Sequence, residues 1–586
     1  MNLIPKPKRI LLHSGDLSLA PIKTTFPESR PEFDRIISAL NTLGAGRSTS
    51  VPLTVKFDSG SYQAEGYYLK IDENGITVNA SSPHGAFYAL QTLRQIAETE
   101  KKYPFLEIYD EPDFPMRGIL YDTTRGRVPT VNGLKKIADF CASLKLNTIT
   151  LYFEHSFAFR EFSGIVSDEE CLTPAELREF IEYCRMLYIN VIPSVALFGH
   201  QYKLLQSDQY KHLCELENYT PTSHYWQERM RHHSFDITNP DSFALIKSFI
   251  DQLCDVFPYN IYLPGVDETF DLCTGKNKDK NVIHEYCKFV DKICSYLSAK
   301  GKTALIADDI IQKHNSEFSL KSKNIIFFHW DYSREPSEMQ FDVLQKSGIP
   351  HISAPSVWSH STVMESLFHS EANIPTLINY AYKHGSIGII NTIWGDYGHF
   401  CDFNCTLYGI AMGSAKSWNV STEITKAFEV DFSAVVYDEH KTNMVNIIRT
   451  ANDVLSSSGI WYWVRWYSSN ILQHDNTDFE NPNVLLAEKN LTLSKEFVKK
   501  LMILKETHPT KHELLDSLII AFKMSDVFNL LIQPITNQKK LNAEDIDNIR
   551  SIIGEYYTLW LRDNKPGEFE EIHLFIDALI GYVENQ

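Results

Sequence analysis

The sequence lacks an excess of positive charge. Its 586 residues include 74 acidic and 56 basic side chains, which gives a formal net charge of −18. A nucleic-acid-binding protein needs a positive surface to displace counterions, and adhesion to an anionic membrane requires the same. We therefore expect neither a nucleic acid nor a membrane as partner.

Long hydrophobic runs and paired cysteines are also missing. The start of the chain has no apolar stretch of the secretory type, and no run is long enough to cross a bilayer. The ten cysteines are scattered without a CxxC pair, and Cys401 and Cys405 have no second pair at zinc-ligand spacing. We interpret them as reduced thiols and expect a cytoplasmic protein with neither a metal nor another cofactor.

Aromatic side chains, in contrast, are plentiful, with 34 Phe, 29 Tyr and 9 Trp. Core packing must explain most of them, because a binding site uses only a few rings. The length predicts about three domains at roughly 100–200 residues each.

Residues 1–112 are typical of a small α+β accessory domain. Alternating apolar residues predict strands at 53–57, 67–71 and 76–79, and the Asp-Glu-Asn-Gly turn at 72–75 predicts a hairpin. Helical spacing follows at 85–96. No obvious catalytic cluster falls in this part of the chain.

Residues 113–420 alternate short apolar runs with helical stretches. Good helix starts occur at Thr173 and Asn239, each of which is followed by proline. Eight such units predict a closed (β/α)8 TIM barrel; an open doubly wound sheet is the alternative, but no glycine-rich phosphate motif follows the first strand. The strands are expected at 118–122, 148–153, 190–195, 260–264, 303–307, 324–328, 350–354 and 388–394.

Residues 421–586 have helical periodicity and little strand-like alternation, which predicts a C-terminal α-helical domain. The aromatic segment at 461–466 is interpreted as helix core or subunit interface rather than as a sugar contact. A homodimer is therefore a hypothesis for this chain.

Polar and aromatic side chains follow the predicted barrel strands. In a (β/α)8 barrel the carboxyl ends of the strands form the active-site rim, so these side chains are expected to share one cleft. They are Asp122 and Arg125, Glu154 and His155, His200, Asp267 and Glu268, Asp308 and Asp309, Trp330, Asp331 and Tyr332, Trp358, and Trp394 and Asp396.

This collection suits the hydrolysis of glycosidic bonds. Carboxylates transfer protons and stabilise a cationic transition state, and tryptophan faces stack on pyranose rings. Asp267 and Glu268 form the sharpest element, because two adjacent acids disfavour joint ionisation and keep one carboxyl protonated toward neutral pH. A solvent-exposed pair is the plainer interpretation, but the apolar stretch at 262–266 argues against it.

Several of these segments resemble glycoside hydrolase family 20, the β-N-acetylhexosaminidases. Segments 114–125, 191–193, 199–200, 265–268 and 394–396 resemble the family's signature motifs, and segments 4–7 and 85–95 resemble its accessory domain. The resemblance covers residues 1 to about 420. The helical tail is more loosely similar to that of intracellular bacterial members.

The resemblance implies an exo-acting hydrolase that removes terminal N-acetyl-β-hexosamine, GlcNAc or GalNAc, from a glycan or glycoconjugate. Glu268 would be the acid and then the base, and Asp267 would orient the substrate's acetamido group, so that no enzyme nucleophile is needed. The other implied roles are hydroxyl binding by Arg125 and Asp396, tuning of Glu268 by His200 and Glu154, and a sugar pocket walled by Trp330, Trp358 and Trp394.

The sequence departs from the family pattern at three points. Val266 replaces the second of two glycines before the acid pair, and Asp396 stands where glutamate is common. The family's tyrosine for the acetamido oxygen has no counterpart near strand seven; Tyr332 and Tyr397 are both candidates. For Asp308, Asp309 and Asp331 a structural role is at least as plausible as a functional one.

Two other functions compete with this one. The chain could be a retaining glycosidase with a protein nucleophile, or a non-catalytic sugar-binding protein on a decayed barrel. The presence together of Arg125, His200, Asp267 and Glu268 speaks against the second, because binding alone needs no proton donor. The sequence does not decide between the two C4 epimers of the sugar.

Overall fold

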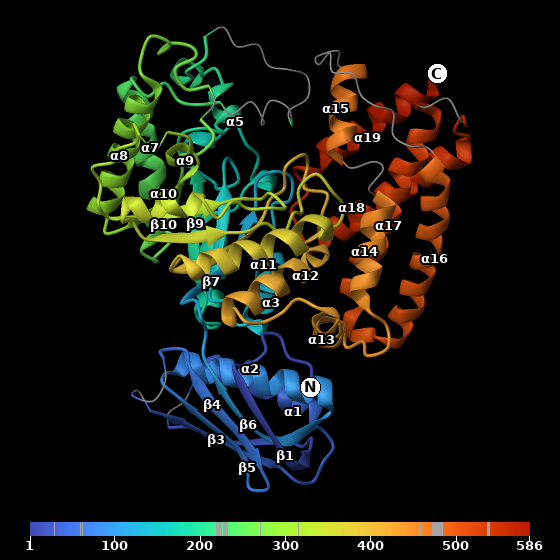
Figure 1. Ribbon diagram of the computed structural model, residues 1–586. Coiled ribbons are helices and arrows are strands. Elements are labelled where there is room, and N and C mark those ends of the chain that lie inside the picture. The colour runs from blue at the N-terminus through green and yellow to red at the C-terminus, as the bar shows by residue number, and fades with distance from the viewer. Residues whose placement is uncertain are drawn as a thin grey trace.

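The structure is a computed structural model in which three parts follow one another along the chain (Figure 1). It describes residues 1–27, 30–58, 60, 63–217, 226, 233–269, 271–314, 316–455, 460–471, 485–535 and 539–585. None of the helices in these ranges is long and apolar enough to cross a bilayer.

The N-terminal part is a six-stranded sheet in the order β1-β6-β4-β5-β3-β2, covered by α2 (Pro83–Glu100). The predicted hairpin is confirmed: β4 and β5 are antiparallel and pair from Tyr67↔Ala80 to Asp72↔Gly75, where Gly75 adopts the positive φ that the turn requires. The other elements are β1 (Arg9–Ser18), β2 (Ile22–Thr25), α1 (Pro31–Leu43), β3 (Val51–Phe57), β4 (Tyr67–Asp72), β5 (Gly75–Ala80) and β6 (Lys102–Asp110).

The central part is a closed barrel of eight parallel strands, so the predicted fold class is confirmed. The barrel closes where β14 pairs with β7 from Gly388↔Met116 to Ile393↔Tyr121. Its strands are β7 (Met116–Asp122), β8 (Thr148–Phe153), β9 (Asn190–Ala196), β10 (Ile261–Gly265), β11 (Thr303–Ala307), β12 (Ile325–Trp330), β13 (His351–Ala354) and β14 (Gly388–Ile393). Buried side chains such as Leu120, Ile192, Leu305 and Ile390 fill the interior.

Helices surround the barrel, and both predicted helix starts are present. Thr173 and Glu176 form a reciprocal capping box at the start of α4, and the Asn239 side chain accepts a hydrogen bond from the Asp241 backbone N–H at the start of α7. The helices are α3 (Val131–Ser143), α4 (Pro174–Arg185), α5 (Tyr202–Leu205), α7 (Pro240–Cys254), α8 (Val282–Ala299), α9 (Asp309–His314), α10 (Gln340–Ser347), α11 (Leu367–Lys383) and α12 (Leu407–Trp418).

The C-terminal part is helical and packs beside the barrel (Figure 1). Trp463 and Trp466 of α15 are buried, and the Trp463 ring contacts Phe528 of α17. The two tryptophans therefore belong to the core of the helical part. The helices are α13 (Lys426–Tyr437), α14 (Met444–Leu455), α15 (Ile460–Asn470), α16 (Leu485–Thr507), α17 (His512–Ile535), α18 (Ala543–Asp563) and α19 (Phe569–Glu584).

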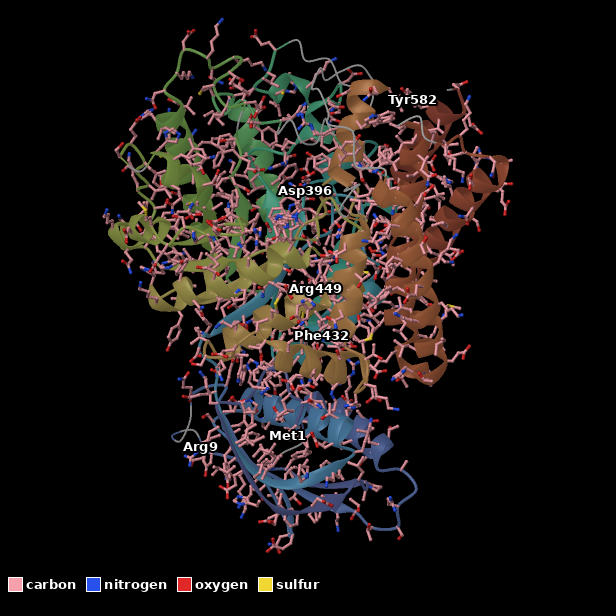
Figure 2. All side chains as sticks on the ribbon, turned by 45° about the vertical axis from the view of Figure 1, so that its right-hand side comes forward. Met1, Arg9, Asp396, Phe432, Arg449 and Tyr582 are labelled. Carbon is pink, nitrogen blue, oxygen red and sulfur yellow. The ribbon has the colours of Figure 1, made fainter. Side chains whose placement is uncertain are left out.

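Charged side chains, most of them buried, join the three parts. Lys145 of the barrel pairs with Asp110 of β6 at 2.9 Å, and Arg127 donates to the Tyr556 hydroxyl of α18 at 3.0 Å. Arg449 of α14, which lies near the middle of Figure 2, pairs with Glu371 of α11 at 2.7 Å. The helical part is therefore bonded to the same barrel helix that begins beside the cleft described below.

Candidate active site

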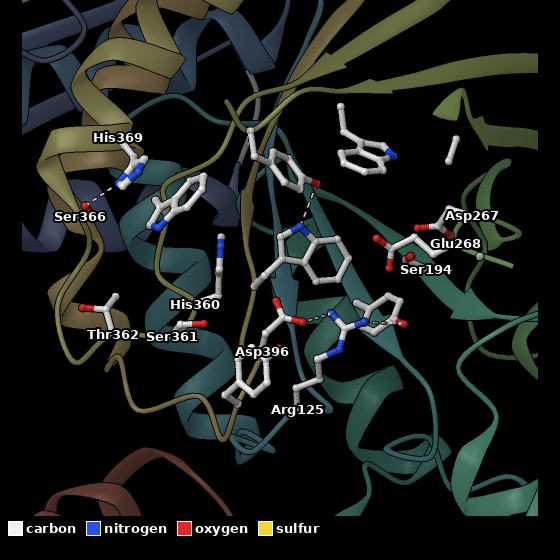
Figure 3. Close-up of a pocket in the computed structure, with 18 of the residues that line it drawn as sticks. Arg125, Ser194, Asp267, Glu268, His360, Ser361, Thr362, Ser366, His369 and Asp396 are labelled. Carbon is white, nitrogen blue, oxygen red and sulfur yellow. Dashed lines mark hydrogen bonds and ion pairs between the residues drawn. The ribbon is translucent and has the colours of Figure 1, made fainter. Parts of the chain in front are cut away.

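A cavity of about 880 Å³ opens at the carboxyl ends of the barrel strands. Eight of the side chains that the sequence singled out for the site line it together, although they come from five different strand ends (Figure 3). These are Arg125, Asp267, Glu268, Trp330, Tyr332, Trp358, Trp394 and Asp396. Two further predicted site residues, Glu154 and His200, are buried and lie against Arg125 and Glu268 of this wall.

The acid pair lies just beyond β10, where the backbone changes direction. Val266 is fully buried, and Asp267 and Glu268 then both reach the cavity. This turn is possible because Glu268 adopts a left-handed φ of 48°, a conformation that residues other than glycine, asparagine and aspartate seldom adopt. Burial raises the pKa of Asp267, and the neighbouring Glu268 charge raises it further, while His200 opposes the shift.

His200 holds the second member of the pair. Its Nε2 lies 3.4 Å from Glu268 Oε2, and its side chain is almost completely buried. His200 also has a left-handed φ, of 58°. Backbone strain of this kind is often concentrated at functional sites, where the surrounding packing maintains it.

Arg125 is held among three carboxylates. Its guanidinium lies 3.5 Å from Asp122, 3.3 Å from Glu154 and 3.4 Å from Asp396. It also lies 5.0 Å from the ring centroid of Trp394. Burial alone would raise the pKa of Asp396, but the charge of Arg125 and the smaller effects of His360 and His200 together outweigh burial and lower it, so Asp396 stays ionised.

The aromatic side chains that line the cavity are held by contacts with one another and with neighbouring residues. Trp394 Nε1 donates to the Tyr332 hydroxyl at 2.8 Å, and the Tyr332 ring lies 5.1 Å from that of Trp330. Trp358 stacks on His369 with ring centroids 4.0 Å apart and planes within 8° of parallel. The rings are therefore fixed before any ligand arrives, which is the preorganisation that a sugar site needs.

The three aspartates without an assigned role have different surroundings. Asp308 pairs with His329 at 2.7 Å, and Asp331 accepts backbone hydrogen bonds from Ser333 and Ser337, so both have clear structural partners. Asp309 is closer to the chemistry, because it accepts a long, 3.5 Å hydrogen bond from the Glu268 backbone N–H. Burial and the nearby Asp267 raise the pKa of Asp309 to about 7.

Sequence reasoning missed one side of the cavity. His360, Ser361, Thr362 and His369 line it from the segment between β13 and α11 and the start of that helix, and Asn452 lines it from α14 of the helical part. These residues do not follow a strand directly, so the spacing of the barrel motifs carries no signal for them. Tyr152, the penultimate residue of β8, could have been found from the strand position alone.

A closed parallel barrel with an acid pair, a clamped arginine and aromatic walls at its carboxyl rim has the fold and site of a barrel glycosidase. The family models agree. Residues 1–111 match glycosyl hydrolase family 20, domain 2, and residues 114–358 match the glycosyl hydrolase family 20 catalytic domain. The chain belongs to glycosyl hydrolase family 20.

Individual relatives are distant. A beta-hexosaminidase of Porphyromonas gingivalis is 26% identical over 369 residues, which cover 53% of this chain and 46% of the relative. Hexosaminidase D of Bos taurus is 23% identical over 303 residues, which cover 47% of this chain and 83% of the relative. With the beta-hexosaminidase subunit A1 of Dictyostelium discoideum the match covers 55% of the relative, so the chain spans about half the length of several of these proteins.

Solved structures share the fold. The Flavobacterium johnsoniae chitobiase superposes with a TM-score of 0.62 and 18% identity, covering 98% of this chain and 99% of that one. A beta-N-acetylhexosaminidase of Bacteroides fragilis gives a TM-score of 0.61 and 19% identity, covering 75% of this chain and 96% of that one. The first match includes the helical part, so that part also belongs to a known arrangement.

Proposed function

We propose that this chain is an exo-acting β-N-acetylhexosaminidase that works by a retaining, substrate-assisted mechanism. The observation that carries the proposal is the acid pair, because Asp267 and Glu268 share one cavity with a clamped arginine and fixed tryptophans. The family models and the names of the curated relatives support the same activity.

The proposed reaction has two steps. Glu268 donates a proton to the glycosidic oxygen while the substrate's own acetamido oxygen attacks C1, so that the leaving group departs and an oxazolinium ion forms. Glu268 then takes a proton from water, which adds to C1 and restores the acetamido group with the original configuration. Asp267, whose carboxylate faces the same cavity, stabilises the positive charge on the acetamido nitrogen in between.

The other side chains hold the sugar. Arg125 and Asp396 offer charged hydrogen-bonding groups for the hydroxyls at C3, C4 or C6, while Trp394 offers a face for the ring. Of the two tyrosines considered for the acetamido oxygen, Tyr332 is favoured. Its hydroxyl accepts a hydrogen bond from Trp394 and interacts electrostatically with Asp267 and Glu268, so it lies on the same side of the cavity as the acid pair.

The test is turnover of aryl N-acetyl-β-glucosaminide and the matching galactosaminide. We expect hydrolysis of at least one, with inhibition by a thiazoline that mimics the cyclised acetamide. Glu268→Gln should lower kcat by roughly 10²–10⁴ and keep thiazoline binding. A folded protein that turns over neither substrate contradicts the proposal, and covalent trapping by a 2-fluoro sugar would instead indicate a protein nucleophile.

A cytoplasmic location and a homodimer are further proposals. All ten cysteines are free thiols and nine of them are buried, which suits a reducing compartment. Met502 and Ile503 of α16 and Leu574 of α19 are exposed apolar side chains on the helical part, where a second copy could bind. Light scattering tests the dimer, and a monomer at micromolar concentration would remove it.

A further inference from the structure

The cavity has two halves. In Figure 3, Asp267 and Glu268 lie on one side, Arg125 and Asp396 lie in the middle, and His360, Ser361 and His369 lie on the far side. The charge interactions agree with this arrangement, because His360 interacts with Asp396 and Arg125, whereas Tyr332 interacts with Asp267 and Glu268. We call the far half the second lobe; it is lined by Trp358, His360, Thr362, Phe368, His369 and Asn452.

The position of the second lobe decides which part of a substrate can enter it. Under the proposed function, C1 of the sugar lies at Glu268, and the hydroxyls on the opposite side of the ring lie at Arg125 and Asp396. The second lobe begins beyond Asp396, so it faces the C4 or C6 hydroxyl and lies away from the leaving group. Whatever occupies it must be attached to the non-reducing side of the N-acetylhexosamine.

The cavity is large enough for such a group. Its volume is about 880 Å³, near the upper end of the roughly 300–1,000 Å³ range of ligand pockets. A cavity of this volume is larger than one amino sugar requires. Phe368, at the outer edge of the second lobe, is 63% exposed, an unusual state for a large apolar ring. The Arg334 guanidinium lies 3.6 Å from its centroid and restricts the ring. A restricted, exposed aromatic ring beside a sugar pocket provides a stacking surface.

The chemistry of the lining favours a neutral occupant. Arg125 is the sole lysine or arginine among the described residues that line the cavity, and three carboxylates already surround it. Burial lowers the pKa of His360 and of His369, so both are neutral near pH 7. Asp453 adds a carboxylate. Arg334 packs against Phe368 at the edge of the lobe and does not line the cavity. Inside the lobe a sulfate or phosphate would therefore find no lysine or arginine, whereas a sugar would find aromatic faces, hydroxyls and imidazoles.

We infer that the second lobe is a binding subsite for a neutral sugar linked to the C4 or C6 hydroxyl of the N-acetylhexosamine. This inference rests on the proposed function. The enzyme would hydrolyse the same β-glycosidic bond by the same two steps in both kinds of substrate. A substituted substrate would release an intact disaccharide, and an unsubstituted one would release the single amino sugar. The substrate class therefore extends to glycans whose N-acetylhexosamine is already substituted.

The experiment compares three probes. The plain probe is the aryl glycoside of N-acetyl-β-glucosamine, and the two galactosylated probes carry an additional galactose β-linked at O4 or at O6 of that sugar. The terminal galactose has no acetamido group, so the enzyme cannot remove it first by the proposed mechanism. We expect direct aryl release, with an intact disaccharide as co-product, from at least one galactosylated probe at a kcat/KM within about tenfold of the plain one.

The outcomes separate the two proposals. Turnover of the plain glycoside with more than 1,000-fold lower kcat/KM on both galactosylated probes overturns the subsite and leaves the proposed function intact. Failure of all three probes, with no thiazoline binding, overturns the proposed function itself.

A pair of variants locates the subsite. Phe368→Ala should lower the ratio of kcat/KM on the preferred galactosylated probe to that on the plain probe by roughly tenfold, from the loss of a stacking surface. Tyr382→Ala is the control, because Tyr382 is 51% exposed on the same helix and does not line the cavity. An equal ratio in both variants would place the second sugar elsewhere and contradict the assignment.

Discussion

Arg125 shows how much one side chain can determine at this site. A planar guanidinium contacts Asp122, Glu154 and Asp396 and stacks between Tyr152 and Trp394, whereas a lysine ammonium is a point charge and cannot do the same. The position just after the first strand was sufficient to predict that Arg125 faces the cavity. Its three partners come from three different strand ends. All three were expected at this rim, but no local pattern shows that they contact Arg125.

We expect Arg125→Lys to lower kcat/KM on the aryl substrate by roughly 10- to 100-fold, because charged hydrogen bonds contribute about 1.5–3 kcal/mol each. Steady-state kinetics measure this loss, and a thermal melt checks that the variant is folded. A loss smaller than threefold would mean that the guanidinium geometry does not matter for the substrate.

Asp309 gives a prediction about pH. Its pKa is raised to about 7, whereas an unfolded aspartate titrates near 3.9, so the unfolded chain loses this proton first. This group's contribution to stability is therefore complete below about pH 4 and is lost as the pH rises to about 7. The Asp309→Asn side chain resembles the protonated aspartate. The free energy of unfolding of this variant should therefore exceed that of the parent by up to a few kcal/mol at pH 8 and by much less at pH 5.

Urea unfolding at both pH values measures this difference for Asp309. Asp331→Asn is a suitable comparison, because Asp331 accepts backbone hydrogen bonds in an exposed turn. A stability difference that does not grow with pH would show that Asp309 is ionised in the folded protein.

At the scale of elements, the strands were predictable and one loop was not. Strands buried in a parallel barrel are nearly continuous apolar runs, and all eight were found within a few residues of their ends. The segment between β13 and α11 depends on distant residues. Asn452 of α14 accepts a hydrogen bond from the Leu367 backbone N–H at 2.6 Å and donates to the Glu365 carbonyl at 2.7 Å, across more than eighty residues of sequence.

We expect Asn452→Ala to lower the free energy of unfolding by about 2 kcal/mol, because it leaves two backbone groups without their partner. It should also lower the activity ratio for galactosylated over plain probes, since the second lobe loses its support. Asn446→Ala is the matched control: it is the same change on an exposed face of the same helix. Equal stability losses in the two variants would contradict this role for Asn452.

At the scale of the whole molecule, one buried arginine of the barrel connects the barrel to the helical part. Arg127 contacts Asp402 at 3.1 Å and the Tyr556 hydroxyl at 3.0 Å, and it lies 4.4 Å from the Trp560 ring centroid. The periodicity of each segment predicts the secondary structure of that part. The local sequence around Arg127 does not indicate that its side chain contacts a helix more than 400 residues later. The domain order was therefore accessible from sequence, and the joint between domains was not.

We expect Arg127→Met to destabilise the protein by about 3–5 kcal/mol, because Asp402 would remain buried without its cation. Denaturant unfolding followed by tryptophan fluorescence measures the change. Adding Asp402→Asn to the variant should recover part of the loss. No recovery in the double variant would mean that the effect arises from packing rather than from charge.

The left-handed backbone at the rim has a broader consequence. Glu268, His200, Trp358 and Tyr397 all hold a positive φ, between 48° and 62°, that their residue types disfavour. Each of these four positions is thus a compromise in which the side chain serves the ligand while the main chain would prefer glycine or asparagine. Replacing these residues with glycine would relieve the backbone strain and raise stability, but it would also remove side chains from the proposed site, so we expect stability and turnover to change in opposite directions here.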